Sequence, residues 1–233
     1  MSTVLVLGVK GSPGATTTAL LLAGCTEGAL LVDADPDGGV LAVRHGLSRE
    51  PGLSTLAADR TAGLGSGDRH LQWIGDVAVL VGPDHPERAS ALWARAGSRL
   101  ADSIRAYGRP TVIDGGRVGR SRTGAPLEQV VDLTVVVARS DTEGLVAAMN
   151  LPEDLDAGLI VVDSGPHAPA ELAETSGRAV LGTLPLDRRT ASAVNGEALA
   201  WSRRAATRSP LARSAQTLAG AIKVFSAERE GVR

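Results

Sequence analysis

The sequence has few aromatic residues, a single cysteine and only two lysines. Phe, Trp and Tyr together make up 2% of its 233 residues. Alanine, valine and leucine must therefore fill the core, and a nucleic-acid site built from stacked aromatic rings is disfavoured. Cys25 is the only cysteine, which excludes an intramolecular disulfide. Because Lys10 and Lys223 are the only lysines, a lysine that falls inside a motif is informative.

Long apolar runs are absent as well. The N-terminal run at residues 4–9 is too short to span a membrane, and it contains no cleavage-site pattern. We therefore expect a cytoplasmic protein. Hydrophobic residues make up 43% of the chain, which is enough for one large core at this length. The expected organisation is a single domain over residues 1–233.

Positive charge gathers toward the C-terminus. From Arg188 onward there are nine basic and three acidic residues, a charge of +6 in a chain whose net charge is −2. Such a region can attract DNA or an anionic membrane surface, and a solvated helical face is the alternative. An apolar stripe at helical spacing in the same region favours packing on a sheet over a membrane anchor. Its members are Leu211, Ala215, Leu218, Ile222 and Phe225.

Short apolar runs alternate with helical patterns along the chain. Strands are predicted at residues 4–9, 29–32, 77–81, 111–113, 133–138, 159–162 and 179–184. Helices are predicted at 16–23, 86–107, 142–149, 169–176 and from 189 onward, with loops at 63–67 and 115–124. This alternation predicts an α/β fold with a doubly wound, mostly parallel sheet and helices on both faces. The four histidines (His45, His70, His85, His167) show no metal-ligand spacing and are expected on the surface or in loops.

A turn rich in glycine joins the first predicted strand to the first predicted helix. Such a turn points backbone N–H groups at one spot, and the helix dipole adds positive charge there, so a phosphate chain is the natural ligand. The standard phosphate-loop pattern G-x-x-x-x-G-K-[ST] fails at two positions, however. Val9 stands at its first glycine and Ala15 stands at its lysine.

A variant of this loop fits the sequence better. The run Lys10-Gly11-Ser12-Pro13-Gly14-Ala15-Thr16-Thr17 resembles the deviant Walker A motif K-G-G-x-G-K-T-T of the ParA/MinD ATPases, which belong to the SIMIBI class of P-loop proteins. Lys10 matches the signature lysine of that family, Ser12 replaces its second glycine, and Ala15 replaces its conventional lysine. A chance match at Lys10 is improbable in so lysine-poor a chain.

Later segments extend the resemblance in the order of the family, over about the first 200 residues. Residues 33–36, Asp-Ala-Asp-Pro, resemble switch I, and residues 112–116 resemble the Walker B and switch II element. The loop with Pro185, Leu186 and Asp187 resembles the one that packs against adenine. The family's asparagine near adenine is absent, because Asp163 stands at the corresponding strand end.

The resemblance implies ATP and Mg²⁺ as cofactors. The loop residues Gly11, Ser12, Pro13, Gly14, Ala15, Thr16 and Thr17, together with Pro185, Leu186 and Asp187, would bind the nucleotide. Thr16 and Asp114 would hold the metal ion, with Asp114 in its second coordination shell. Lys10 would reach the phosphates bound by a second subunit, and Asp35 would place the attacking water. Lys10 and Asp35 are therefore the predicted catalytic residues.

Ala15 removes the charge that the conventional lysine would bring to the β- and γ-phosphates. We therefore expect ATPase activity to be weak or absent, with binding retained. The first hypothesis is an ATP-dependent homodimeric switch that recruits or positions a protein partner in DNA partition, cell division or a secretion or pilus apparatus. TadZ/CpaE-type members, with degraded Walker A motifs, are the nearest analogy. The alternative is a pseudo-ATPase scaffold that binds no nucleotide, and a competent ATPase is a third reading.

Overall fold

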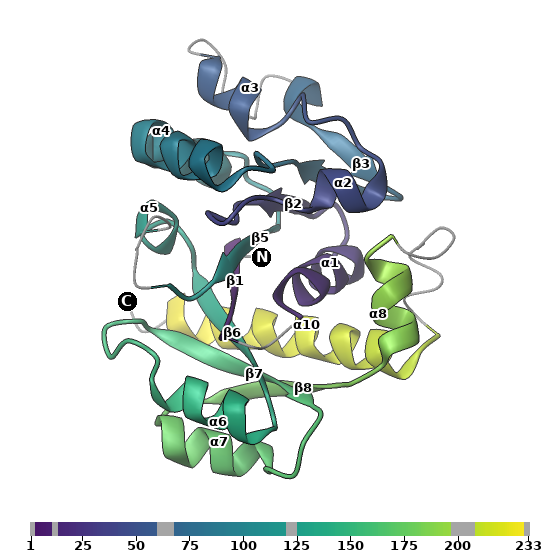
Figure 1. The fold of residues 1–233 in the computed structure, drawn as a ribbon, viewed down its shortest axis with the longest axis vertical. Helices are drawn as coiled ribbons and strands as arrows, with labels where there is room; N and C mark the ends of the chain where they lie inside the picture. The colour runs from purple at the N-terminus through teal and green to yellow at the C-terminus, as the bar shows by residue number, and fades with distance from the viewer. Residues whose placement is uncertain (1–2, 11–13, 60–67, 120–124, 197–207, 231–233) are drawn as a thin grey trace.

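The computed structural model describes residues 3–10, 14–59, 68–119, 125–196 and 208–230 of the chain. Within this part, eight strands form one sheet in the order β3-β4-β2-β5-β1-β6-β7-β8 (Figure 1). Every neighbouring pair is parallel except β3 and β4, which pair antiparallel at one edge. The predicted doubly wound, mostly parallel α/β sheet is confirmed.

The strands are short apolar runs because helices bury most of the sheet on both faces. Their bounds are β1 Thr3–Gly8, β2 Leu30–Asp33, β3 Gln72–Ile74, β4 Val77–Leu80, β5 Thr111–Arg117, β6 Leu133–Arg139, β7 Ala157–Asp163 and β8 Val180–Pro185. All seven predicted strands are present. The edge strand β3 was not predicted, since it has three residues and the side chain of Trp73 is half exposed. The loop predicted from residue 115 is wrong at its start, because β5 continues beside β1 to Arg117.

The helices that connect these strands also follow the predicted order. They are α1 Ala15–Cys25, α2 Leu41–His45, α3 Leu53–Ala58, the 3₁₀ helix η2 Asp68–His70, α4 Pro86–Ala106, α5 Ala125–Glu128, α6 Thr142–Met149, α7 Pro169–Ser176, α8 Arg188–Val194 and α10 Pro210–Glu230. The short helices α2, α3, η2 and α5 were not predicted, because one or two turns leave little periodic signal. The loop predicted at residues 63–67 lies outside the described residues.

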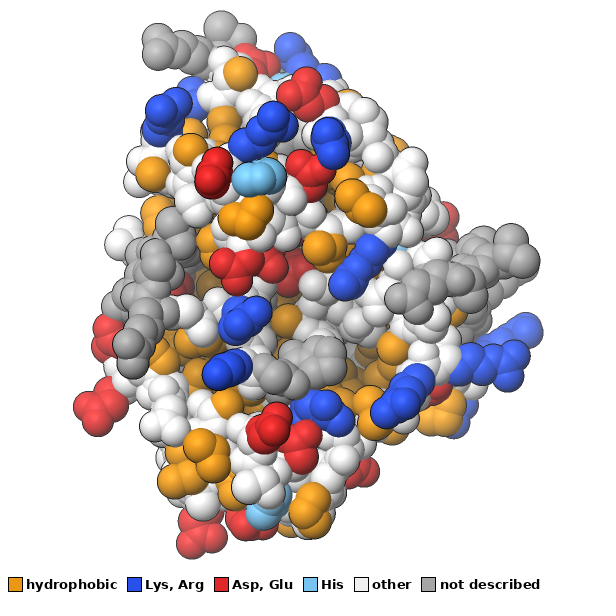
Figure 2. Space-filling view, viewed as in Figure 1, with side chains coloured by type: hydrophobic (Ala, Val, Ile, Leu, Met, Phe, Trp, Pro, Cys, Tyr) orange, Lys and Arg blue, Asp and Glu red, His pale blue; other side chains and the backbone are white. Residues whose placement is uncertain are grey.

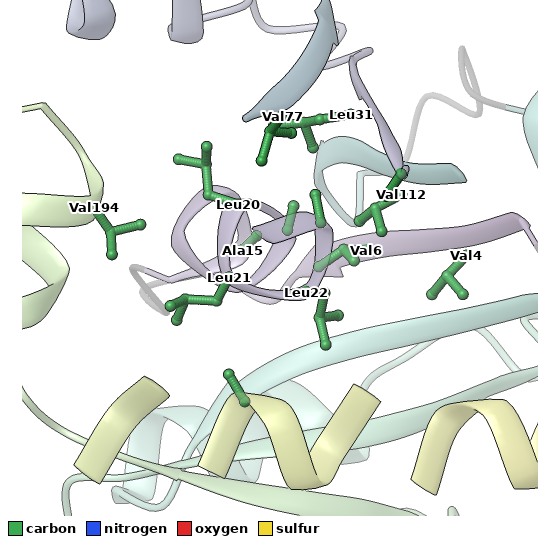
Figure 3. Close-up of a cluster of buried hydrophobic side chains, with 14 of the residues drawn as sticks. Val4, Val6, Ala15, Leu20, Leu21, Leu22, Leu31, Val77, Val112 and Val194 are labelled. Carbon is green, nitrogen blue, oxygen red and sulfur yellow. The ribbon is translucent and has the colours of Figure 1, made fainter. Parts of the chain in front are cut away.

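The helices divide between the two faces of the sheet, and alternate residues of each strand point to one face or the other. Val4 and Val6 of β1 join the cluster that packs α1, α2, α8 and α10 against the sheet (Figure 3). Leu5 and Leu7 of the same strand join the cluster under α3, α4, α5, α6 and α7. These two clusters pack on the two faces of the sheet. They keep the carboxyl ends of the parallel strands together along one edge of it.

The apolar stripe of α10 packs against the sheet, as predicted. Leu211, Ala215, Leu218 and Ile222 are buried in the α1 cluster, and Phe225 is partly buried against it. The helix therefore uses its apolar face inside the protein. Within the described ranges, no helix combines the length and the apolar character that crossing a membrane requires.

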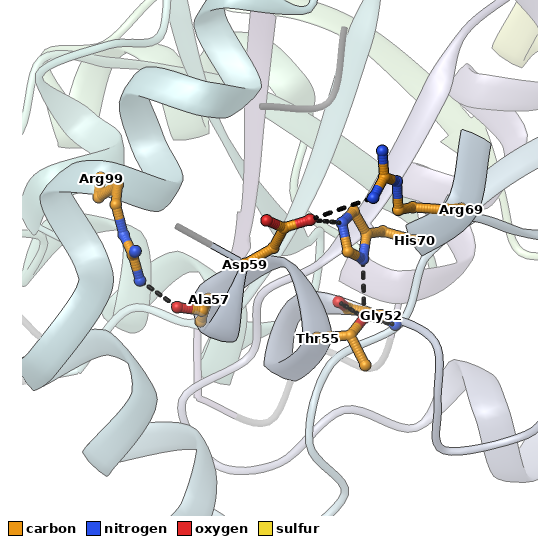
Figure 4. Close-up of polar contacts among 7 residues, drawn as sticks. All are labelled: Gly52, Thr55, Ala57, Asp59, Arg69, His70 and Arg99. Carbon is orange, nitrogen blue, oxygen red and sulfur yellow. Dashed lines mark hydrogen bonds and ion pairs between the residues drawn. The ribbon is translucent and has the colours of Figure 1, made fainter. Parts of the chain in front are cut away.

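His70 departs from the expectation of a surface or loop histidine. Its side chain is buried in a polar cluster between η2 and α3 (Figure 4). Nδ1 lies 3.0 Å from Oγ1 of Thr55, and Nε2 lies 3.4 Å from the Asp59 carboxylate, which Arg69 also approaches at 3.7 Å. Thr55 in turn donates to the carbonyl of Gly52 at 2.8 Å. This cluster fastens η2 to α3, and its role is structural.

Candidate functional site

A large cleft opens at the carboxyl edge of the sheet, where the strand order reverses. β1 stands between β5 and β6, and the helices that follow β1 and β6 cover opposite faces of the sheet. In open α/β sheets, helices that diverge in this way leave a crevice beyond the strand ends. The crevice here has a volume of about 1680 Å³. Basic side chains gather over the middle of this face of the molecule (Figure 2).

The floor of the cleft is the junction between β1 and α1. Val9 still donates its backbone N–H to the carbonyl of Val137 at 3.1 Å, and Lys10 then leaves the sheet with an exposed side chain. Gly14 precedes α1 with a φ of 145°, a conformation that only glycine adopts without strain. Of the predicted phosphate-loop residues, Lys10, Gly14, Ala15, Thr16 and Thr17 line the cleft. Gly11, Ser12 and Pro13 lie outside the described residues.

Helix α1 begins one residue earlier than predicted. Ala15 is its first residue, Gly14 is its N-cap, and no side-chain hydrogen bond caps it. Its first turn carries no acidic residue, so the N–H groups at this end keep the positive end of the helix dipole directed at the cleft. The methyl group of Ala15 is buried in the α1 cluster. It brings no charge to the cleft.

Two buried aspartates lie below the cleft on neighbouring strands, one at the end of β2 and one in the middle of β5. Asp33 of β2 pairs in register with Asp114 of β5, and both side chains are about 1% exposed. Burial and, to a smaller extent, the negative charge of Asp114 together raise the pKa of Asp33 to about 7. Burial also raises the pKa of Asp114, against hydrogen bonds from the Thr16 side chain and the Gly116 N–H. Oδ1 of Asp33 and Oδ2 of Asp114 accept no hydrogen bond from the described residues.

Asp35 lines the cleft above this pair. The backbone N–H of Asp37 donates to its Oδ1 at 2.8 Å, which holds the carboxylate beside the end of β5. Burial raises the pKa of Asp35, and the nearby guanidinium of Arg117 opposes the shift. The structure therefore gathers Lys10, Thr16 and Asp35 at one cleft, although they come from different segments of the sequence.

The polar residues in the cleft that were not predicted include four arginines and Asn195. Arg44 of α2, Arg117 of β5, Arg139 of β6, Arg188 of α8 and Asn195 after α8 all line it. Arg117 directly follows the Asp-Gly-Gly run at residues 114–116, so that motif could have predicted its place beside the cleft. The others could not be predicted in this way, since they reach the cleft only through the packing of α2 and α8 and the order of the strands.

Comparison with known proteins agrees with this geometry. No protein-family model matches the chain. An uncharacterised protein of Mycobacterium tuberculosis, found in two strains, is 29% identical over 247 residues that cover 98% of this chain and 66% of the relative. The chain thus spans about two thirds of the length of the curated relatives it matches.

Solved structures give the fold. The cell division ATPase MinD of Pyrococcus furiosus is 18% identical, with a TM-score of 0.74 over 96% of this chain and 98% of that chain. A ParA family ATPase of Chlorobium tepidum is 18% identical, with a TM-score of 0.71 over 94% and 97%. MinD of Pyrococcus horikoshii, solved with Mg-ADP, is 19% identical, with a TM-score of 0.71 over 97% of both chains. The chain has the ParA/MinD fold.

In this ParA/MinD fold, the far end of the cleft is formed by the segments after β6 and β8. Pro185 and Leu186 line it, and Leu186 is 46% exposed. Asp187 also lines it, but its carboxylate caps α8 by accepting from the N–H of Thr190 at 3.0 Å and from its hydroxyl at 2.6 Å. The Thr190 hydroxyl holds the pKa of Asp187 below its usual range. The carboxylate of Asp187 therefore serves as the N-cap of α8.

Asp163 does not line this part of the cleft, although it ends β7. Arg139 on the neighbouring strand does line it. Its Nε donates to the hydroxyl of Ser164 at 3.0 Å and lies 3.1 Å from the Asp141 carboxylate. A guanidinium offers donors only, so any base edge placed against Arg139 would have to present acceptors. Arg139 was not predicted at this part of the cleft.

The chain's own groups fit a divalent cation next to phosphate. Thr16 lies at the start of α1 with its side chain hydrogen-bonded to Asp114, and the second carboxylate oxygen of Asp114 is buried without a partner among the described residues. No group of three or more His, Cys, Asp or Glu side chains in the described ranges could hold a metal ion alone. A cation here would need ligand oxygens from a bound phosphate or from water.

Proposed function

We propose that this chain binds ATP with Mg²⁺ and works as a nucleotide-switched homodimer that positions a protein partner, with little or no hydrolysis. The observation that supports it most is the cleft itself. Its floor is an uncapped helix N-terminus behind Gly14, and Thr16, Thr17, Asp35 and Lys10 surround that floor. Backbone N–H groups, hydroxyls and a cation together form a phosphate-binding environment.

Each predicted residue except Asp187 has a role in this proposal. The loop from Gly11 to Thr17 cradles the phosphates. Thr16 would ligate Mg²⁺, and Asp114, which accepts a hydrogen bond from the Thr16 side chain, would hold the ion from the second coordination shell. Mg²⁺ neutralises phosphate charge when bound. Asp35 orients a water toward the terminal phosphate, and Pro185 with Leu186 offers an apolar surface to the base.

The exposed side chain of Lys10 supports a dimer. It belongs to the cleft lining yet is not buried within its own subunit. In the proposed dimer, each Lys10 reaches the phosphates held by the other subunit. Each Lys10 then supplies, from the other subunit, part of the positive charge that a lysine in place of Ala15 would bring. The dimer forms only when nucleotide is bound, because the phosphates are what the two lysines share.

The structural neighbours favour a protein partner. One of them is the MinC:MinD cell division protein complex of Aquifex aeolicus, 12% identical with a TM-score of 0.72. A membrane anchor on α10 is disfavoured, because its apolar stripe is buried in the protein. Exposed Arg213 and Lys223 on the same helix leave DNA as a further partner class.

The experiment compares the two lysines of the chain. The mass of the protein is measured by light scattering with and without Mg²⁺-ATP, alongside the ATP dissociation constant. We expect ATP-dependent dimers for the natural protein and for Lys223→Ala, which removes an exposed lysine far from the cleft lining. Lys10→Ala should bind ATP more weakly and remain monomeric.

A scaffold that binds no nucleotide is the second candidate. The buried methyl of Ala15 favours it, because a loop without its internal lysine loses a charge-assisted phosphate contact. No binding at millimolar ATP would overturn the switch and leave the scaffold. ATP-induced dimers that persist in Lys10→Ala would overturn the role of Lys10 alone.

A further inference from the structure

Three side chains form a chain of hydrogen bonds along one wall of the cleft. Nη1 of Arg44 donates to Oδ1 of Asn195 at 2.9 Å, and Nδ2 of Asn195 lies 2.9 Å from Oγ1 of Thr17. All three side chains line the cleft. They come from α2, from the end of α8 and from the first turn of α1, so one contact chain joins three helices.

The direction of each bond follows from chemistry. A guanidinium has donors and no acceptor, so the oxygen of the Asn195 amide must face Arg44. The amide nitrogen must then face Thr17 and donate to it. Its other hydrogen goes to the carbonyl of Ala191 at 2.8 Å. Thr17 Oγ1 is thereby an acceptor in this bond, and no described residue accepts its own hydrogen.

Backbone packing holds Arg44 and Asn195 in place relative to each other. Gly196, which follows Asn195, has a φ of 82°, and a Cβ on it would lie 2.1 Å from the carbonyl oxygen of Arg44. The end of α8 thus rests directly on the backbone of α2. Such close approach is possible only for glycine, and it fixes the distance between the Arg44 and Asn195 backbones.

We propose that Arg44 and Asn195 are positioning residues that preset the Thr17 hydroxyl as a hydrogen-bond donor to a phosphate group in the cleft. This inference rests on the proposed nucleotide binding. Asn195 Nδ2 donates to one lone pair of the Thr17 hydroxyl oxygen, so the hydroxyl hydrogen turns away from Asn195 and toward the ligand. An anion accepts this hydrogen strongly, because hydrogen bonds to ionised acceptors are about twice as strong as neutral ones.

We call the hydrogen-bond chain Arg44–Asn195–Thr17 the relay. The test replaces its amide donor, at Asn195, by a carboxylate, which has the same shape and only accepts. In Asn195→Asp, the carboxylate accepts from Arg44 and also captures the Thr17 hydrogen. We expect ATP affinity to fall by about tenfold, close to the loss in Thr17→Val, as for one charge-assisted hydrogen bond. Tripolyphosphate, which has no base, should show the same loss.

A double-mutant cycle separates orientation from added charge. In the Thr17→Val background no hydroxyl is left to reorient, so Asn195→Asp should cost about threefold or less, from charge repulsion alone. Thermal melting of each variant reports folding. If Asn195→Asp lowers ATP affinity equally in the two backgrounds, the relay is overturned, because charge repulsion alone then accounts for the loss of affinity.

A second variant keeps the test decisive if Asn195→Asp unfolds. Arg44→Ala removes one of the contacts that fix the orientation of the Asn195 amide and also removes a positive charge from the cleft, so ATP affinity should fall more in the natural background than in Thr17→Val. An effect of Arg44→Ala that is equal in both backgrounds would count against the relay.

If the natural protein binds neither ATP nor tripolyphosphate, the proposed function and the relay both fail. If it binds ATP but the cycle shows no coupling, only the relay fails.

Discussion

At the residue scale, the proposed lack of hydrolysis depends most on Ala15. Its methyl group packs in the α1 cluster and lines the cleft at the point where the family pattern carries a lysine. The same turn keeps its other features, since Gly14, Thr16 and Thr17 all face the cleft. In the proposed function, this turn keeps groups suited to binding phosphate and lacks the lysine that would stabilise developing charge.

Ala15→Lys should restore that charge. We expect ATP affinity and phosphate release each to rise by about tenfold or more, because a lysine side chain can extend from the first turn of α1 into the cleft. Calorimetry and a phosphate-release assay measure the two effects. Ala221→Lys on the exposed side of α10 is the matched control for an added charge. Measurable turnover in the natural protein with no gain in Ala15→Lys would indicate a competent ATPase.

At the element scale, the long strands and helices were predictable and the short ones were not. α6 and α7 were predicted with their observed bounds, since Asp141 and Pro169 mark their starts and an apolar pattern runs between the ends. β3 and α2 carry too few residues for a periodic signal. α2 nevertheless places Arg44 in the cleft, so part of the site depended on an element that pattern reading missed.

The junction between α2 and α8 depends on one glycine. Gly196→Ala should lower the free energy of unfolding by about 2 kcal/mol, because an added Cβ meets the Arg44 carbonyl and the φ of 82° is strained for alanine. Gly220→Ala is the matched control, since no atom lies within 4 Å of its added Cβ on α10. That change should raise stability by about 1 kcal/mol through helix propensity. Urea unfolding of both variants measures the difference, and equal effects would contradict the close packing.

At the scale of the whole molecule, the cleft forms because the sheet order reverses at β1. Helices that leave β1 and β6 on opposite faces open the crevice, and the parallel pairing of β2 with β5 brings Asp33 beside Asp114. Residues from six or more segments therefore converge without any of them being close in sequence.

Mg²⁺-ATP should stabilise this edge of the molecule selectively. At a concentration 100 times its dissociation constant, one bound ligand adds about 2.7 kcal/mol to the free energy of unfolding. Hydrogen exchange should slow most in α1, α2 and the end of α8, which line the cleft, and least in α4, which packs under the other face. Protection of α4 as strong as that of α1 would argue against binding in the cleft.

The sequence by itself determined the fold class, the glycine that precedes the first long helix and the order of Lys10, Asp35 and Asp114 along the chain. Buried parallel strands must be apolar runs, and a turn with glycine before a helix is a local feature, so both are visible along the chain. Only the tertiary structure decided that Arg44, Arg139 and Asn195 share the cleft and that Asp187 is a helix cap. Those roles depend on which strands are neighbours and on how short helices pack, and neither leaves a periodic trace in the sequence.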